Sequence, residues 1–271
     1  MIKIDKNTGK SFVKILKIMS ALRDPKTGCE WDKDQDSNSI KSYCIEEAYE
    51  VVEAIENNDN EALCEELGDL LFQVIFHSEI NNEKGNFSII DVIDNLSEKL
   101  IRRHPHVFEK DSNTNSKKQI EKNWVNIKQQ ERIAKGNIGM LDDIPKNFPA
   151  MTRSLKLQKR ASENGFDWKK PNDTLKKIDE EKHELEIALI QQKKEAIEEE
   201  IGDLIFSVIN LSRKLKIDPE NALRKTNNKF SERINYIEKK LQKENKKFNQ
   251  SKLIELEKLW NQAKIDIKQV K

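Results

Sequence analysis

Glycine and proline are scarce in this chain of 271 residues, which contains eight glycines and six prolines. Few positions therefore break a helix or require a tight turn. Long β-branched segments of alternating polarity are also missing, which argues against a sheet. Apolar and charged residues each make up 36%, against averages of about 45–50% and about 25%. Because the apolar residues recur at helical spacing, the composition predicts an all-α fold of amphipathic helices with charged outer faces.

Cysteine is also scarce. Cys29, Cys44 and Cys64 show neither metal-binding C-x-x-C spacing nor a disulfide framework, and we expect them to pack as small apolar residues. The first ten residues, MIKIDKNTGK, lack the apolar stretch of a secretion signal. The longest apolar run, around 70–76, is too short to span a bilayer. These absences predict a protein of the reducing cytoplasm that contacts no membrane.

The chain also lacks an excess of either charge, because it contains 49 basic and 48 acidic residues and has a net charge of +1. This balance does not indicate a nucleic-acid groove, and we expect no nucleic-acid partner. Helical patterns are predicted near 11–23, 38–57, 60–83, 88–103 and 117–135. The second half has them near 149–163, 173–190, 194–216, 219–245 and 251–268.

The two halves repeat one pattern of acidic and aromatic residues. Glu-Glu-x-x-Glu occurs at 46–50 and 180–184, and it is followed nineteen residues later by Glu-Glu-x-Gly-Asp-Leu at 65–70 and 199–204. Each half also opens with a tryptophan beside an acid and closes with Trp-x-x-x-Lys. Four elements in the same order predict an internal duplication. We expect an N-terminal module over 1–136, a linker over 137–148 and a C-terminal module over 149–271.

The acids of each half are spaced to converge at a helical hairpin. Glu47 and Glu50 share one helix face, as do Glu66 and Asp69. The midpoints of 47/69 and of 50/66 both fall at residue 58, within a segment of turn-forming residues. In the second half, the midpoints of 181/203 and 184/200 both fall at residue 192. If 58 and 192 are hairpin tips, four carboxylates face one another in each half.

On a helical wheel these acids form a narrow stripe with apolar residues on both sides. Carboxylates so placed repel one another and lose solvation, and a hard cation such as Mg²⁺ relieves both costs. The pattern predicts Mg²⁺ ligands at Glu47, Glu50, Glu66, Asp69, Glu181, Glu184, Glu200 and Asp203. A solvated acidic helix face is the plain alternative in so charged a chain. A di-iron bundle is disfavoured, because only Glu180-x-x-His183 matches its Glu-x-x-His pattern.

Basic and aromatic residues recur beside the acids. Lys-x-x-x-Arg pairs at 99–103 and 229–233 can grip phosphate oxygens, and the tryptophans of the Trp-x-x-x-Lys elements can stack on a base. Taken singly, surface charge and core packing explain such residues. Their joint recurrence with the acids favours a polyphosphate ligand.

The doubled acidic motif resembles the MazG family of all-α nucleoside triphosphate pyrophosphohydrolases, whose pattern is EExxE followed by EExxD. Five further segments also resemble the family's two-domain bacterial members. They are CEWDKDQ (29–35), ELGDLLFQV (66–74), RRHPHVF (102–108), LDDIP (141–145) and GFDW (165–168). The resemblance covers essentially the whole chain. It implies two tandem four-helix-type modules, a homodimer, and Mg²⁺-dependent hydrolysis of nucleoside triphosphates to monophosphate and pyrophosphate.

The resemblance also implies residue roles in the second half, where two-domain relatives usually place catalysis. Glu181, Glu184, Glu200 and Asp203 become the catalytic metal ligands, and a carboxylate outside the inner shell takes the proton of the attacking water. The nucleotide-binding residues are expected to be Lys177, Ile178, Asp179, Glu180, Ala196, Ile197, Glu198, Glu199, Lys229, Arg233, Trp260 and Lys264. The helix of Arg233 can also continue past it, whereas Pro105 ends the first-half helix just after Arg103.

Two other functions compete with this enzyme. A metal-stabilised helical scaffold would bind nucleotides without turnover, but it has no use for the retained Lys/Arg and Trp pairs. A phosphatase that removes the terminal phosphate would release orthophosphate instead of pyrophosphate.

Overall fold

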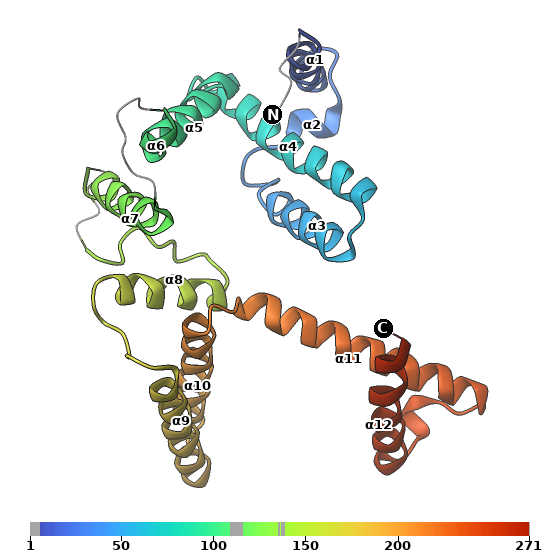
Figure 1. Ribbon diagram of the computed structural model, residues 1–271. Coiled ribbons are helices and arrows are strands. Elements are labelled where there is room, and N and C mark those ends of the chain that lie inside the picture. Colours follow the sequence, from blue (N-terminus) through green and yellow to red (C-terminus); the bar gives the residue numbers. More distant parts are fainter. Residues whose placement is uncertain (1–5, 109–115, 135, 137–138, 271) are drawn as a thin grey trace. The chain divides into compact units, whose positions relative to one another are not determined.

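The structure is a computed structural model that describes residues 6–108, 116–134, 136 and 139–270. Every regular element in these ranges is a helix (Figure 1), which confirms the predicted all-α fold. Within the same ranges, no helix is both long enough and apolar enough to cross a membrane. The contacts divide the chain into two compact units, 1–129 and 130–271.

The first unit is built around the long helix α4 (Asn60–Glu83), on which α1 (Lys6–Leu22), α3 (Tyr43–Asn57) and α5 (Ile89–Arg103) all pack. The short helix α2 (Glu30–Asp34) lies between α1 and α3 in the sequence, and the short helix α6 (Pro105–Phe108) follows α5. The unit boundary falls within α7 (Lys117–Ala134). The core of the first unit is formed by Met19, Ile40, Ile75, Phe76 and Ile80.

The second unit contains α8 (Ala150–Glu163), α9 (Pro171–Gln191), α10 (Lys194–Lys214), α11 (Pro219–Lys243), the 3-10 helix η1 (Phe248–Gln250) and α12 (Leu253–Val270). Helix α10 packs against both α8 and α9, and α12 packs against α11. Part of the predicted linker belongs to this unit, because Arg160 on α8 pairs with Asp143 at 2.8 Å. The backbone of this linker is also held in place, because Arg160 and Arg132 both donate hydrogen bonds to the carbonyl oxygen of Met140.

Both acidic hairpins turn at the residues that the sequence symmetry predicts. Asn58 follows α3 with a φ of 55°, and Gln192 follows α9 with a φ of 56°. The next residue differs between the hairpins. The carboxylate of Asp59 accepts hydrogen bonds from the N–H groups of residues 61 and 62 at the start of α4, whereas Lys193 makes no side-chain cap for α10. The first turn therefore has a helix cap that the second lacks.

The helix predicted near 38–57 begins only at Tyr43. The carboxylate of Asp36 accepts hydrogen bonds from the N–H groups of Asn38 and Ser39, both at 2.8 Å. Such side-chain bonds to nearby backbone compete with helix formation. They hold a turn that leads into Ile40, which is fully buried in the core.

The cysteines depart from expectation as well. All three are free thiols, and Cys29 and Cys64 are exposed while Cys44 is half-buried. The prediction that they pack as small apolar residues is therefore wrong for Cys29 and Cys64.

Candidate metal and nucleotide site

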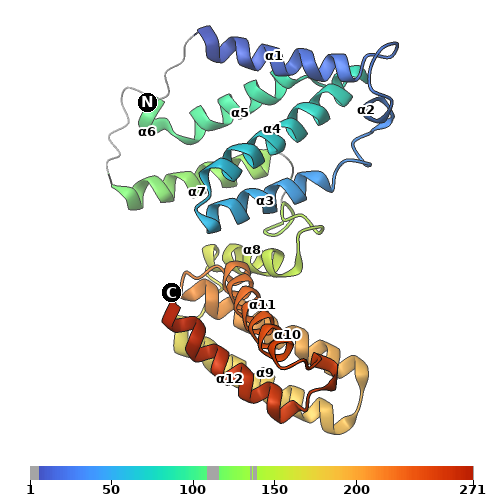
Figure 2. The same ribbon diagram turned by 90° about the vertical axis from the view of Figure 1, so that its right-hand side faces the viewer.

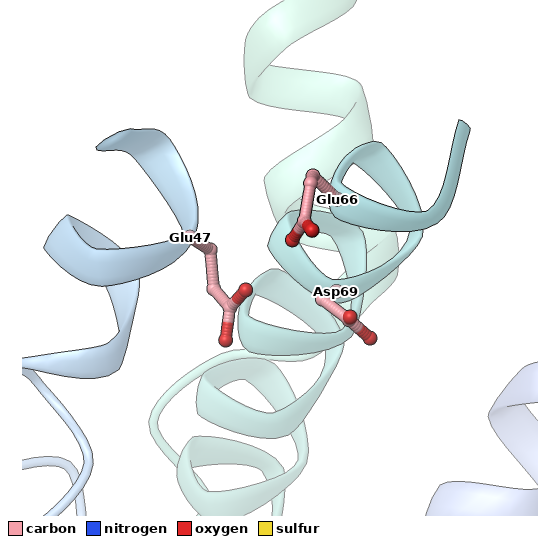
Figure 3. Close-up of side chains that lie close together, drawn as sticks. All are labelled: Glu47, Glu66 and Asp69. Carbon is pink, nitrogen blue, oxygen red and sulfur yellow. The ribbon is translucent and has the colours of Figure 1, made fainter. Parts of the chain in front are cut away.

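In the first unit, Glu47 on α3 and Glu66 on α4 turn their carboxylates toward each other, and the exposed Asp69 lies beside them on α4 (Figure 3). One oxygen from each lies within 4.8 Å of the others. Burial raises the pKa of Glu47, and the charges of Asp69 and Glu50 raise it further. Burial likewise raises the pKa of Glu66, with Glu50 as the next cause. Carboxylates that hinder one another's ionisation are stabilised by a cation placed between them.

The second unit has a similar cluster, in which the first helix supplies two acids, Glu181 and Glu184 on α9, and the second supplies one, Glu200 on α10. Oxygens of these three acids also lie within 4.8 Å of one another, and Glu181 is buried, with 5% of its surface exposed. Burial is the largest cause that raises the pKa of Glu184 and of Glu200. The second-largest cause that raises the pKa of Glu184 is its hydrogen bond with Glu181. For Glu200, the second-largest cause is the negative charge of Glu184.

Each cluster thus gathers three of the four acids that the sequence spacing predicts to meet. Glu50 and Asp203 lie outside these closest groups, although their charges still raise the pKa of Glu66 and Glu200 respectively. The donors in both clusters are carboxylate oxygens. This set fits Mg²⁺ better than metals that prefer nitrogen or sulfur ligands.

Lys177 places a cation inside the second cluster. Its Nζ lies 2.9 Å from Oε1 of Glu181 and 2.7 Å from Oε1 of Glu180, and the hydrogen bonds to these two acids raise the pKa of Lys177. The sequence prediction gave Lys177 a role toward the nucleotide and missed this ion pair. The signal was present, because Lys177 precedes Glu181 by four residues on one helix.

The expected nucleotide-binding residues fall into two groups. Lys177 to Glu180 on α9 and Ala196 to Glu199 on α10 lie on the acidic hairpin. The other group lies between α11 and α12, where the guanidinium of Arg233 is 5.0 Å from the ring centroid of Trp260. Lys229 and Lys264 are exposed on the same two helices. Figure 1 shows α12 against α11 and apart from the α9–α10 hairpin, so one chain keeps the two groups separate.

The entry to α9 is tied to the end of α10. Asp167 accepts hydrogen bonds from Arg213 at 2.5 Å and from Lys214 at 2.7 Å. Burial opposes ionisation of Asp167, but these bonds hold its pKa below the usual value. The GFDW segment therefore fixes where α9 begins relative to α10, and with it the register of the acids.

A family model of the MazG nucleotide pyrophosphohydrolase domain matches the chain over residues 35–108 and 169–237. The chain is 44% identical to a Thermotoga maritima protein named nucleoside triphosphate pyrophosphohydrolase/pyrophosphatase MazG, over 96% of this chain and 98% of that protein. The chain belongs to the MazG family. An Escherichia coli K12 protein named nucleoside triphosphate pyrophosphohydrolase is 41% identical over 93% of this chain and 96% of its own length. Bacillus subtilis YabN, described as uncharacterized, is 41% identical over 91% of this chain and 50% of its own length.

The two MazG matches each contain one acidic hairpin. Residues 35–108 include α3 and α4, and residues 169–237 include α9, α10 and most of α11. The internal duplication read from the sequence is therefore confirmed. Lys229 and Arg233 lie inside the second match, whereas Trp260 and Lys264 lie beyond it.

Proposed function

We propose that this chain hydrolyses nucleoside triphosphates to nucleoside monophosphates and pyrophosphate, with Mg²⁺ held by the acids of the second unit. The observation that carries the proposal is the acidic cluster, which lies within a MazG match in each unit. Relatives that align along nearly the whole chain are named for this activity. Turnover of this kind in the cytoplasm would serve the upkeep of the nucleotide pool.

The metal ligands in this proposal are Glu181, Glu184, Glu200 and Asp203. Mg²⁺ bound there would offset phosphate charge and lower the pKa of a bound water. The buried Glu181 fixes one ligand position, because its side chain has little room to move. A carboxylate of the cluster outside the inner shell then accepts the proton of the attacking water.

The nucleotide would be held by the basic and aromatic residues. Lys177 and Lys229 offer ammonium groups to phosphate oxygens, and Arg233 offers a planar fork of donors. Arg233 already stacks over the ring of Trp260, which presents an aromatic surface to a base. This division leaves charge neutralisation to α9–α10 and nucleotide recognition to α11–α12.

We further propose that the working form is a homodimer. Many large apolar side chains on α10 remain exposed in the single chain, including Ile201, Ile205, Phe206 and Val208, between 40% and 49%. Phe230 on α11 and Ile265 on α12 are 56% and 54% exposed. Burial of such surface favours association. Within one chain, α11 and α12 lie apart from the acids on α9 and α10 (Figure 1). In a dimer, the second copy can place its own α11 and α12 over these acids.

The reaction is tested with a panel of ribo- and deoxynucleoside triphosphates in Mg²⁺, with both products identified by chromatography. We expect monophosphate and pyrophosphate in equal amounts, and no reaction in EDTA. Diphosphate and orthophosphate as first products would overturn the proposal in favour of a phosphatase. Nucleotide binding without any product would favour the non-catalytic scaffold.

A further inference from the structure

The two acidic clusters differ at one position that matters for their charge. The repeat offset is 181 − 47 = 134 residues, so the counterpart of Lys177 is residue 177 − 134 = 43, a tyrosine. Tyr43 lies against the ring of Trp31 at 6.5 Å between centroids and brings no positive charge to Glu47. The second cluster thus contains a resident cation at a position where the first has a neutral ring.

Lys177 holds an oxygen that a metal ion needs. Its ammonium lies 2.9 Å from Oε1 of Glu181, and the Glu181 side chain is 7% exposed while that of Lys177 is 31% exposed. Glu181 is the buried member of the acidic group, so solvent screens this contact only weakly. A Mg²⁺ ion bound to the same carboxylate would sit about 2.0–2.1 Å from its oxygen. A dication and an ammonium so close to one carboxylate repel each other strongly.

Lys177 has a second partner, Glu180, which lies outside the acidic triad and whose side chain is 56% exposed. The lysine is therefore tethered at the solvent-facing edge of the cluster as well as inside it. Losing the inner contact leaves the outer one intact, so the ammonium can move toward solvent, where a phosphate would arrive, without losing all its partners.

From these contacts we propose that Lys177 is the resident counter-ion of the second cluster, which leaves Glu181 when Mg²⁺ enters and then pairs with the triphosphate. The proposal rests on the proposed function, because it assigns the same cluster to metal and nucleotide. It makes the two bindings cooperative: Mg²⁺ alone must displace the lysine, whereas Mg²⁺ with nucleotide gives the displaced ammonium a new anionic partner. The first cluster, which has Tyr43 in place of the lysine, binds Mg²⁺ without this requirement.

The test is calorimetric titration of Mg²⁺ alone into the metal-free full-length chain. All proteins carry Glu47→Gln, which disables the first cluster and leaves the second as the metal site. Lys177→Met keeps the length of the side chain and removes its charge. Lys177→Arg keeps the charge. Lys182→Met is the matched control, because Lys182 is on the same helix and pairs with Glu186 at 3.7 Å, away from the cluster.

Without nucleotide, Lys177→Met should bind Mg²⁺ about fivefold more tightly than its parent, the order expected when one partly exposed ion pair no longer has to be broken. Lys177→Arg and Lys182→Met should stay near the parent affinity. Adding a triphosphate analogue with a methylene bridge between the α and β phosphorus atoms should tighten Mg²⁺ binding in the parent far more than in Lys177→Met.

Equal Mg²⁺ affinity in the parent and Lys177→Met would overturn the inference, as would an equal gain in Lys182→Met. Circular dichroism of each variant confirms that the helices are intact. Pyrophosphate release by the unmodified chain is measured separately. If that activity is present but the affinities do not change, the counter-ion role alone fails. If the affinities change but no pyrophosphate is released, the proposed function alone fails.

Discussion

At the residue scale, the site is a set of glutamates whose ionisation is costly. Glu47, Glu66, Glu184 and Glu200 all have a raised pKa, with burial as the largest cause and neighbouring acids as contributors. A metal ligand must be ionised, so protons and Mg²⁺ compete for the same oxygens. The raised pKa values move this competition to a pH above the ordinary pKa of glutamate.

The pH dependence of metal stabilisation follows from these shifts. A carboxyl with a raised pKa favours the folded state when protonated, so the metal-free chain loses that stabilisation as pH rises through the raised value. Bound Mg²⁺ replaces it at higher pH. We expect the Mg²⁺-induced increase in Tm to be large at about pH 7.5 and to become smaller as the pH falls to about 5.5.

The measurement is a melting curve with Mg²⁺ and another with EDTA at each pH. The quantity to compare is the difference in Tm between the two curves at each pH. Burial lowers the pKa of His77, so protonation of His77 destabilises the fold on acidification equally with Mg²⁺ and with EDTA, and this effect cancels in the difference. A Mg²⁺-induced shift that grows as the pH falls would contradict the assignment of these glutamates as ligands.

At the element scale, the two hairpins share a fold but differ in how their second helix begins. Asp59 caps α4 through two backbone N–H groups, whereas Lys193 precedes α10 with no side-chain cap. Its positive charge also lies at the positive end of the helix dipole. The α9–α10 turn is therefore the less stabilised of the two.

Removing the helix cap of α4 and introducing one at α10 should have opposite effects on the free energy of unfolding. Asp59→Ala should cost about 1 kcal/mol, and Lys193→Asp should gain a similar amount, about 0.5–1 kcal/mol. Urea denaturation followed by circular dichroism measures both. Loss of stability in Lys193→Asp would show that the lysine has a contact that outweighs the helix cap.

A glycine inside α4 provides a second test at this scale. A Cβ atom added to Gly68 would meet no atom within 4 Å, and glycine inside a helix costs about 0.5–1 kcal/mol relative to alanine. Gly68→Ala should therefore stabilise the first unit by about that amount.

Gly85 is the matched control for this substitution. It is equally uncrowded, but its φ is +68°, where a side chain costs about 1 kcal/mol. Gly85→Ala should therefore destabilise the same unit. If both alanines act alike in urea denaturation, then backbone conformation is not what distinguishes the two positions.

At the scale of the whole molecule, the question is which unit performs the chemistry. Both units form an acidic cluster, but only the second combines it with Lys177, and its α11–α12 pair carries the stacked Arg233 and Trp260. The proposed division assigns turnover to the second unit and a regulatory role to the first.

Matched substitutions in the full chain separate the units. Glu184→Gln keeps the side-chain shape and removes one charge, and should lower pyrophosphate release on the order of 100-fold to 1000-fold. Glu50→Gln, its counterpart in the first unit, should cost far less. If Glu50→Gln is the inactive variant, the division is reversed. If each variant loses about half of the activity, both units turn over substrate.

The oligomeric state is a prediction at the same scale. We expect light scattering after size exclusion to give twice the chain mass of 31.7 kDa. Ile205→Glu places a charge on the exposed apolar face of α10, where Ile205 is 49% exposed, and should shift the chain toward monomer. A fully active monomer would contradict the need for a second copy.

The sequence by itself determined the helical class, the duplication and the positions of both hairpin tips. These features depend on local periodicity, on i, i+3 spacing and on symmetry about Asn58 and Gln192, all of which are written along the chain. Only the tertiary structure decided the start of α3 at Tyr43, where a turn held by Asp36 prevails over helical periodicity. It also decided which three of the four acids in each half come closest together, and that Arg233 and Trp260 pack with each other. Such outcomes depend on side-chain packing between helices, which spacing along one helix does not specify.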